Sequence, residues 1–185
     1  MTHSVIIFKT KEYRFRAIAE YIAEGLRSGG RVTAVLDSKT LRIIEEMLGY
    51  LGLPTDPKAL RPLSAEELFL YTTTEWKKTL SDLERIIFDG SQENSAAPGG
   101  VRTVLDMTYF LSSQRNYDRV LGFEGEFHDL VRHHNADALC VYFYEYIPDF
   151  FYEQLTGVHS SMQVDPSVFR ASPVFPFERI NPFSS

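Results

Sequence analysis

Glycine is missing from the first strand-to-helix loop of this chain, at a position where many α/β proteins depend on it. The apolar run His3–Phe8 leads into Lys9-Thr-Lys-Glu-Tyr-Arg-Phe15, which contains no glycine. In nucleotide-binding α/β proteins, glycines in this loop let backbone N–H groups surround the phosphates. The Gly-x-Gly-x-x-Gly pattern of dinucleotide-binding proteins is absent as well. The sequence therefore favours sensing or binding over phosphate chemistry.

Other absences narrow the class of protein further. A single cysteine, Cys140, excludes an internal disulfide and is typical of a reducing cytoplasm. No apolar run approaches the roughly 18 residues of a membrane span, and a strand predicted to begin at His3 leaves no room for a signal peptide. The net charge of −6 argues against a nucleic-acid-binding surface. We expect a cytoplasmic protein with no direct DNA binding and no membrane association.

Apolar spacing predicts strands that alternate with helices. Short apolar runs predict strands at His3–Phe8, Arg31–Leu36, Leu60–Leu63, Val101–Leu105, Ala138–Tyr144 and Ser161–Val164. Apolar residues three or four apart predict helices at Glu12–Ser28, Lys39–Leu51, Thr74–Phe88, Asn116–His134 and Pro148–Val158. The polar segment Asp89–Gly100 is predicted to be an exposed loop, and the proline-rich segment from Pro166 an extended or free arm.

This alternation predicts one α/β domain with three layers, in which helices cover both faces of a mostly parallel sheet. In such sheets ligands bind beyond the carboxyl ends of the strands. The predicted strands end at Phe8–Thr10, Asp37-Ser38, Asp106–Tyr109 and Phe143–Glu145. We therefore expect a ligand near these segments.

Several local patterns occur in a familiar order. His3 opens the first strand, and the later patterns are Tyr21-Ile-Ala-Glu-Gly-Leu26, Arg31-Val-Thr-Ala-Val-Leu-Asp37, Gly100-Val-Arg-Thr-Val-Leu-Asp-Met-Thr-Tyr109, Phe123-Glu124, Ala138-Leu-Cys-Val-Tyr142, Val158-His159 and Ser172-Pro-Val-Phe-Pro-Phe177. In this order they resemble the MEDS family, the methanogen/methylotroph sensory domain. The resemblance covers residues 3–177, which we interpret as a single sensory domain followed by a tail at 178–185.

The resemblance implies a fold of the RecA/KaiC type without an intact phosphate loop. It also implies a stand-alone, non-catalytic sensory domain that binds a small, hydrocarbon-derived ligand and signals to a kinase or a transcription regulator. Three positions depart from the family pattern: Asp106 replaces a usual glutamate, Tyr109 stands near a usual tryptophan, and Ser160 replaces the proline of a His-Pro pair. Such changes alter ligand choice, so the resemblance does not identify the ligand.

Eight residues are candidates for ligand binding on position, chemistry or resemblance: His3, Phe8, Asp106, Tyr109, Glu124, Cys140, Tyr142 and His159. Asp106 ends a strand where an ATPase places its magnesium-binding aspartate. It either binds a ligand or joins a polar network, or it acts only as a structural cap. Glu124 and Glu126 point in opposite directions on a helix, and we predict that Glu124 faces inward. Cys140 is predicted to be buried as a small apolar residue.

No cofactor and no metal is expected, although one metal set stays open. His3 and His159 can meet Cys140 across the end of the sheet, which makes a His/His/Cys set in principle. Two other functions also stay open. One is an interaction module, or a homo-oligomer, that uses the aromatic C-terminal half. The other is a degenerate nucleotide-binding enzyme.

Overall fold

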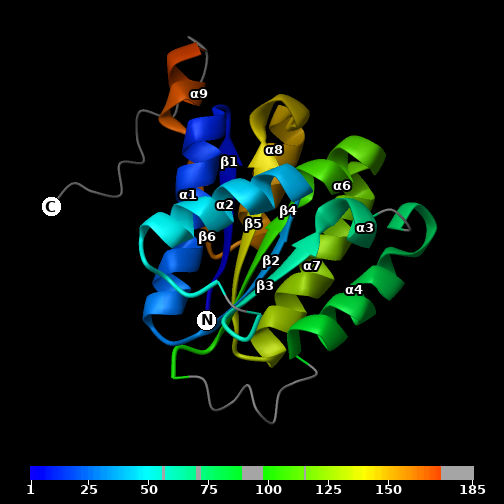
Figure 1. Cartoon of the computed structure of the whole chain (residues 1–185). Coiled ribbons are helices and arrows are strands. Elements are labelled where there is room, and N and C mark those ends of the chain that lie inside the picture. Colours follow the sequence, from blue (N-terminus) through cyan, green and yellow to red (C-terminus); the bar gives the residue numbers. More distant parts are fainter. Residues whose placement is uncertain (56, 70–71, 89–97, 115, 172–185) are drawn as a thin grey trace, which may run out of the picture.

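A parallel sheet forms the centre of the protein in the computed structural model, which describes residues 1–55, 57–69, 72–88, 98–114 and 116–171 (Figure 1). Its six strands are all parallel, in the order β3-β2-β4-β5-β1-β6. The strands are β1 (His3–Phe8), β2 (Arg31–Leu36), β3 (Leu60–Ser64), β4 (Val101–Asp106), β5 (Asp137–Phe143) and β6 (Ser161–Val164). The α/β prediction and each predicted strand are confirmed.

The inner strands are apolar because helices cover both of their faces. In β5, for example, every residue from Ala138 to Tyr142 is buried, as expected for a central strand of a parallel sheet. The two edge strands are more polar: β3 exposes Arg61 and Pro62, and β6 alternates between exposed and half-buried residues. Pro62 has no N–H to donate, which an edge strand tolerates.

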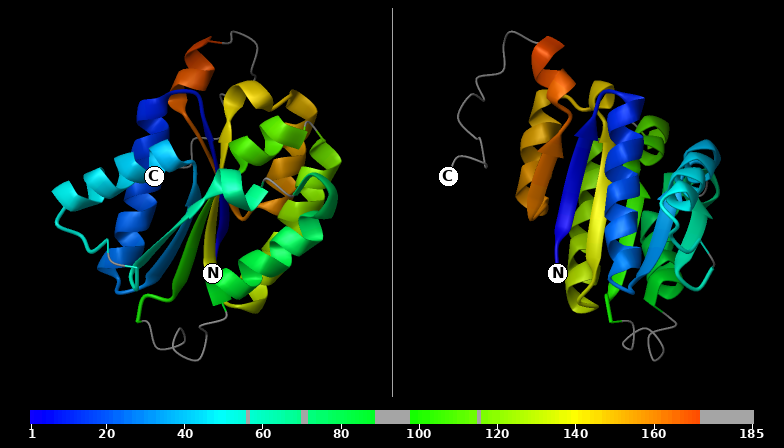
Figure 2. Two further views of the ribbon diagram at one scale, coloured as in Figure 1. Left: turned by 45° about the vertical axis from the view of Figure 1, so that its right-hand side comes forward. Right: turned by 60° about the vertical axis from the view of Figure 1, so that its left-hand side comes forward.

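Helices lie on both faces of the sheet (Figure 2). They are α1 (Lys11–Arg27), α2 (Ser38–Tyr50), α3 (Ala65–Phe69), α4 (Thr72–Phe88), α6 (Met107–Gln114), α7 (Tyr117–His133), the 3-10 turn η1 (Tyr144–Tyr146), α8 (Asp149–Val158) and α9 (Pro166–Ala171). One face packs on α1 and α2, and the other packs on α3, α4, α6, α7 and α8. The sheet therefore separates two hydrophobic cores.

The ends of the long helices follow local rules. Thr10 caps the N-terminus of α1, and the Asp37 carboxylate accepts hydrogen bonds from the backbone N–H groups of Lys39 and Thr40 at the start of α2. Helix α1 ends at Arg27, and two residues later Gly29 adopts a positive φ of 74°. The predicted role of the Gly29-Gly30 pair in ending this helix is thereby confirmed.

The short α3 follows Ser64-Ala-Glu-Glu67, a capping-box pattern that predicts a local turn or short helix, whereas α6 and α9 were not expected. Helix α6 follows β4 directly, and α9 occupies residues 166–171, where we predicted an extended or free arm; that prediction is wrong. The physical reason is that the carboxylate of Asp165 accepts a hydrogen bond from the N–H of Ser167 and so starts a helical turn. Residues 89–97 of the predicted loop and residues 172–185 lie outside the described part of the chain.

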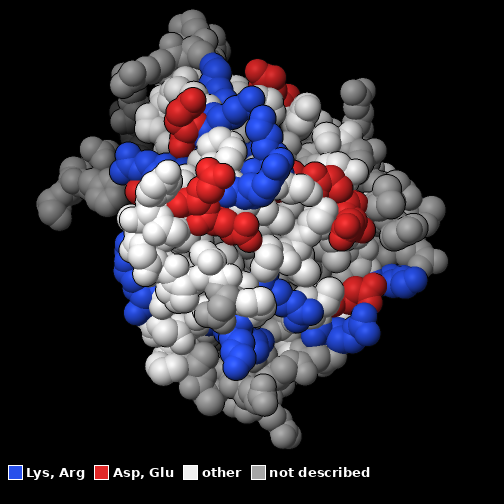
Figure 3. All heavy atoms as spheres, viewed as in Figure 1, with Lys and Arg blue, Asp and Glu red and all other residues white. Residues whose placement is uncertain are grey.

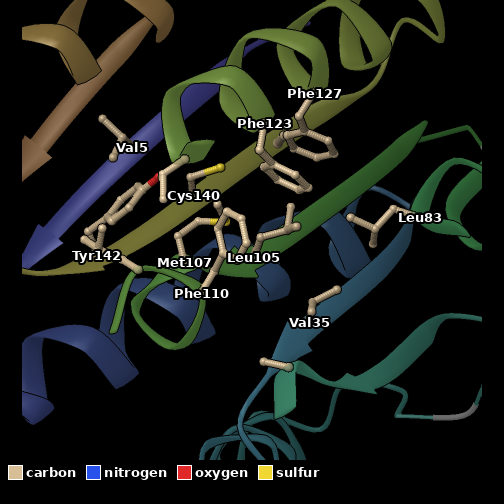
Figure 4. Packing of buried hydrophobic residues seen from close by; sticks show 14 of the residues in the cluster. Val5, Val35, Leu83, Leu105, Met107, Phe110, Phe123, Phe127, Cys140 and Tyr142 are labelled. Carbon is tan, nitrogen blue, oxygen red and sulfur yellow. The ribbon is translucent and has the colours of Figure 1, made fainter. Parts of the chain in front are cut away.

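The larger core lies between the sheet and α7, and Figure 4 shows its centre. Phe123 and Phe127 of α7 lie over β5, and Cys140 and Tyr142 of β5 are on the α7 side of the strand. This core also holds the buried polar side chains described below. Among the helices that the structure describes, none is long and apolar enough to cross a membrane.

Candidate functional site

Four polar side chains meet in the core between the sheet and the helices α7 and α8. They are His3 of β1, Glu124 of α7, Cys140 of β5 and His159, which follows α8. One nitrogen, oxygen or sulfur atom from each lies within 4.8 Å of those of the other three. The side chains are almost fully buried, with exposed fractions of 1% for His3 and 0% for each of the others. We call these four residues the buried cluster.

The fold brings the cluster together from four separate elements. Strands β1 and β5 are neighbours, with His3 opposite Ala138 and Val5 opposite Cys140. His3 and Cys140 therefore lie two positions apart on the same face of the sheet. In α7, Glu124 follows the buried Val120 by four residues, so its carboxylate points into the core with the apolar side chains. The predicted inward position of Glu124 is confirmed, whereas Glu126 is exposed.

The Glu124 carboxylate is the centre of the cluster. Its Oε2 lies 3.3 Å from His3 Nε2, 3.3 Å from Cys140 Sγ and 3.5 Å from His159 Nε2. Its Oε1 accepts a hydrogen bond from the hydroxyl of Tyr142. Cys140 thus donates to a carboxylate and touches an imidazole, so describing it as a small apolar residue was incomplete: it is buried, but its sulfur belongs to a polar network.

Outer contacts orient both imidazoles. His159 Nδ1 lies 2.8 Å from the carbonyl oxygen of Leu155, to which it donates, and this leaves Nε2 facing the cluster. His3 Nδ1 lies 3.4 Å from Nδ1 of His128, so Nε2 of His3 also faces the cluster. Among the described residues, Nε2 of His159 has no hydrogen-bond partner despite its burial. A buried polar atom in that condition is uncommon in folded proteins.

The ionisable groups of the cluster shift one another's pKa values. Burial alone raises the pKa of the Glu124 carboxyl, but the neighbouring imidazoles of His159 and His3 outweigh burial and hold this pKa well below its usual range. Burial lowers the pKa of His3. Burial also acts to lower that of His159, but the Glu124 carboxylate dominates and raises it. Burial and the same carboxylate raise the pKa values of Cys140 and Tyr142.

A small surface groove opens beside the cluster. It has a volume of about 250 Å³, and its lining consists of Gly125, His128, Gly157, Val158, His159 and Ser160. His159 belongs both to this groove and to the cluster, and His128 connects the groove to His3. A Cβ atom built on either glycine meets no heavy atom within 4 Å, so the space above both is open. We call this the α7/α8 groove.

A second, larger groove of about 450 Å³ lies between α4 and α7. Its lining includes Glu84, Glu126 and Asp129, whose side chains are 46%, 47% and 72% exposed. Carboxylates in that setting remain hydrated, and none of them belongs to the buried cluster. The α7/α8 groove is therefore the stronger candidate site.

At the carboxyl ends of the strands, the protein's own charges occupy the expected ligand region. The guanidinium of Arg14 in α1 forms ion pairs with Asp106 and with Asp37, and its distance to Asp37 is 2.7 Å. Asp106 is only 3% exposed and also accepts a hydrogen bond from the N–H of Thr108. The strand-end aspartate thus stabilises an internal network between β2, β4 and α1.

The glycine-free first loop also binds an internal anion. The carboxylate of Asp165 accepts hydrogen bonds from the backbone N–H groups of Lys9 and Thr10, at 3.1 and 2.8 Å, and from the Thr10 hydroxyl at 2.8 Å. These groups lie at the N-terminus of α1, where phosphate-binding proteins hold their phosphates. Hydrogen bonds to the carboxylate outweigh its burial and lower the pKa of Asp165.

The structure brings five of the eight predicted site residues together and separates the other three. His3, Glu124, Cys140, Tyr142 and His159 meet, as the open His/His/Cys set anticipated. The remaining three lie elsewhere. Phe8 packs in the opposite core beside Arg14, Asp106 belongs to the ion network at the strand ends, and Tyr109 packs at the edge of the core that holds the cluster.

Three contributors were missed: His128, Arg14 and Asp165. His128 follows Glu124 by four residues, a spacing that places both on one helix face and was readable in the sequence. Arg14 stands in the first turn of the first helix, and its acidic partners follow two different strands. Asp165 is remote in sequence from the loop that it caps, and the sequence carries no signal for this pairing.

The comparisons agree with the familiar order of local patterns. The family model described as MEDS, "MEthanogen/methylotroph, DcmR Sensory domain", matches residues 2–160. The match includes all four residues of the buried cluster and the groove beside it. A search of the curated proteins finds no match to this sequence.

Proposed function

This chain belongs to the MEDS family of sensory domains, and we propose that it senses a small molecule bound in the α7/α8 groove. One observation carries the proposal. The groove opens beside His159, whose buried Nε2 lacks a hydrogen-bond partner among the described residues. A molecule in the groove therefore lies next to the buried cluster, and binding there can change the hydrogen bonds of its imidazoles.

The size of the groove suits a ligand of only a few heavy atoms. Its volume of about 250 Å³ is below the roughly 300–1,000 Å³ of pockets for drug-sized molecules. Two glycines and Val158 offer little polarity, whereas the imidazole of His128 and the hydroxyl of Ser160 can donate or accept a hydrogen bond. A short hydrocarbon derivative with one polar group matches this lining, and it agrees with the ligand class that the family resemblance implies.

The two glycines add independent support. Gly125 lies within α7 and Gly157 within α8, where glycine costs about 0.5–1 kcal/mol relative to alanine. Nothing crowds either position, so alanine would fit without a clash. Neither helix stability nor crowding within the protein gives a reason for glycine here, whereas a ligand that packs directly on the two helix backbones would.

The proposed role is non-catalytic. An enzyme that uses a nucleotide needs free donors at the N-terminus of the first helix and a carboxylate for its cation. Here those donors bind Asp165, and the strand-end carboxylate Asp106 binds Arg14. These internal pairs favour a sensor over the alternative of a degenerate nucleotide-binding enzyme.

The proposal includes a partner that receives the signal, either a regulator of transcription or a kinase. Helix α7 carries Glu124 inside and Gly125 at the groove, so a ligand contacts the helix that holds the centre of the cluster. On the face seen in Figure 3, acidic and basic side chains are interspersed, and no broad basic surface for nucleic acid is visible there. We therefore favour a protein, rather than nucleic acid, as the partner that receives the signal.

The test is binding of short halogenated, methylated and hydroxylated compounds, followed by NMR of the 15N-labelled protein. We expect saturable shifts for amides around Gly125, Gly157 and Ser160. The variant Gly125→Leu places a side chain in the groove and should abolish these shifts. Gly49→Leu is the matched control, because Gly49 also lies in a helix with open space around it but belongs to α2.

The outcomes separate the candidate functions. Shifts that persist in Gly125→Leu would place the binding site elsewhere and refute the groove. Saturable binding of ATP with Mg2+ would restore the enzyme alternative. If no compound binds and the protein forms stable oligomers, the interaction module becomes the better explanation.

A further inference from the structure

The buried cluster contains the donor set of a transition-metal site. We propose that His3 Nε2, Glu124 Oε2, Cys140 Sγ and His159 Nε2 bind one Zn2+ ion. The four atoms come from four different elements and lie within 4.8 Å of one another. This inference deepens the proposed function and rests on it for the access route through the α7/α8 groove.

The spacing of the four atoms is close to that of a tetrahedral site. Zinc bonds of about 2.0–2.3 Å place tetrahedral ligand atoms about 3.3–3.8 Å apart. In the structure, Glu124 Oε2 lies 3.3, 3.3 and 3.5 Å from the ligand atoms of His3, Cys140 and His159, and His3 Nε2 lies 3.3 Å from Cys140 Sγ. The two remaining distances between ligand atoms are at most 4.8 Å, so small side-chain movements would centre an ion among them.

The chemistry of the donors favours zinc over harder cations. Two imidazoles, one thiolate and one carboxylate form a mixed N/S/O set, which suits Zn2+, whereas Mg2+ and Ca2+ prefer oxygen alone. Binding requires the Cys140 thiol to lose its proton, and the imidazoles of His3 and His159 to lose any proton at Nε2; all of these protons pass to solvent. The charges then balance: the ion brings two positive charges, and the Cys140 thiolate and the Glu124 carboxylate bring one negative charge each. A neutral assembly is the least costly to bury.

The outer contacts are those of an oriented metal site. His159 donates from Nδ1 to the Leu155 carbonyl, which presents the Nε2 lone pair to the cluster. His3 contacts His128 through Nδ1, and Tyr142 donates to the Glu124 oxygen that faces away from the other ligands. Metal-binding histidines and carboxylates in proteins usually have such partners.

A hydrogen-bond network without metal explains the cluster less well. Such a network should satisfy its buried atoms with hydrogen bonds, yet Nε2 of His159 makes none with the described residues and has only the ion-pair contact with Glu124 Oε2 at 3.5 Å. The Glu124 Oε2 atom faces three groups at once. A metal ion would bond both atoms directly. His159 and His128 also line the α7/α8 groove, which gives an ion a short path from solvent.

The experiment is a Co2+ titration of the full chain, prepared without a histidine tag and stripped of metal with a chelator. Cobalt is the probe because it takes tetrahedral zinc sites and absorbs visible light. We expect saturation at one ion per chain, tetrahedral d–d bands, and a near-ultraviolet charge-transfer band from the Cys140 thiolate. Added Zn2+ should remove all these bands. The metal content of the protein as purified, measured by mass spectrometry, provides a second readout that needs no refolding.

Two variants make the titration specific. Cys140→Ser keeps a small hydroxyl beside Glu124 and should abolish the charge-transfer band, with binding weakened at least about 100-fold. His133→Gln is the control, since His133 is exposed and lies outside the cluster; its titration should match that of the parent chain. Near-ultraviolet circular dichroism checks that each variant is folded.

Two results would overturn the metal site: no saturable cobalt spectrum in folded protein that was also purified without zinc, or equal binding by the parent chain and Cys140→Ser. Neither bears on the groove, whose test uses Gly125→Leu and small organic compounds. Loss of metal binding together with retained small-molecule shifts would refute the zinc proposal alone, and the reverse would refute the groove alone.

Discussion

Replacement of Glu124 by glutamine should destabilise the protein severely, even when metal is absent. The carboxylate is fully buried and faces His3, Cys140 and His159 through one oxygen and Tyr142 through the other. Glutamine has nearly the same shape but no charge, and its NH2 group replaces one of the two acceptor oxygens, which face the cluster and the Tyr142 hydroxyl. The variant therefore removes the electrostatic attraction and leaves the imidazole of His159 with an uncompensated charge.

The expected loss can be set from known buried pairs. Breaking one by removing a single partner costs about 3–5 kcal/mol. In a chain of this size, each kcal/mol lowers the melting temperature by about 2–4 °C, so a decrease of about 6–20 °C is expected. Urea denaturation in the presence of a chelator measures the free energy of unfolding. The single Trp76, half-buried on α4, reports the transition by fluorescence.

Glu126→Gln is the matched control, two residues further along the same helix. Its carboxylate is 47% exposed and lies 3.7 Å from Lys77, so its removal should change the free energy of unfolding by less than about 0.5 kcal/mol. A loss below about 1 kcal/mol for Glu124→Gln, or equal losses in the two variants, would mean that the cluster contributes little to folding. The description of Glu124 as its electrostatic centre would then be incorrect.

Two further predictions concern the opposite end of the sheet. Asp165→Asn should lower the free energy of unfolding at pH 7 by about 1–3 kcal/mol, because the carboxylate accepts backbone hydrogen bonds at the starts of both α1 and α9. The folded pKa of Asp165 lies below the unfolded value of 3.8, so the carboxylate stabilises the fold fully above pH 3.8 and loses this effect as the pH falls below it. Urea denaturation at a series of pH values should therefore show the free energies of unfolding of the variant and the parent chain converging at low pH. Arg14→Gln should cost about 3 kcal/mol, since it leaves the buried carboxylate of Asp106 without its cation. Thermal unfolding against Arg16→Gln, an exposed arginine of the same helix, checks this; equal melting temperatures would contradict it.

Much of the fold could be predicted because its rules are local. Runs of apolar residues identified the strands, and apolar spacing with capping residues identified the five long helices. Helix α6 escaped because it follows β4 without a loop, so its short buried stripe of Met107, Phe110 and Leu111 continues the apolar run of the strand. Helix α9 escaped because Asp165 starts it through a contact that also depends on α1.

The site was harder to predict because it depends on strand order. His3 and Cys140 are 137 residues apart, and only the pairing of β1 with β5 makes them neighbours. The alternation of side chains along β5 correctly placed Cys140 and Tyr142 on one face of the sheet. The helical spacing of α7 correctly predicted that Glu124 points inward. What no local rule supplied was the arrangement of the sheet that places these faces together, or the end of the sheet at which they meet.

In α/β folds the ligand usually binds at the carboxyl ends of the strands, but here the candidate site lies at the opposite end of the sheet. At the carboxyl ends, Asp165 occupies the donors of α1 and Arg14 neutralises Asp106 and Asp37. These pairs occupy, within the part of the chain that the structure describes, the donors and the carboxylate that would bind a nucleotide with its cation. Near the start of β1, the buried Nε2 of His159 makes no hydrogen bond with a described residue and lies beside an open groove. A ligand needs open space and a protein atom that can still form a bond, and this end of the sheet offers both. For this reason, the search for the signal that this domain senses should begin at the α7/α8 groove rather than at the strand ends.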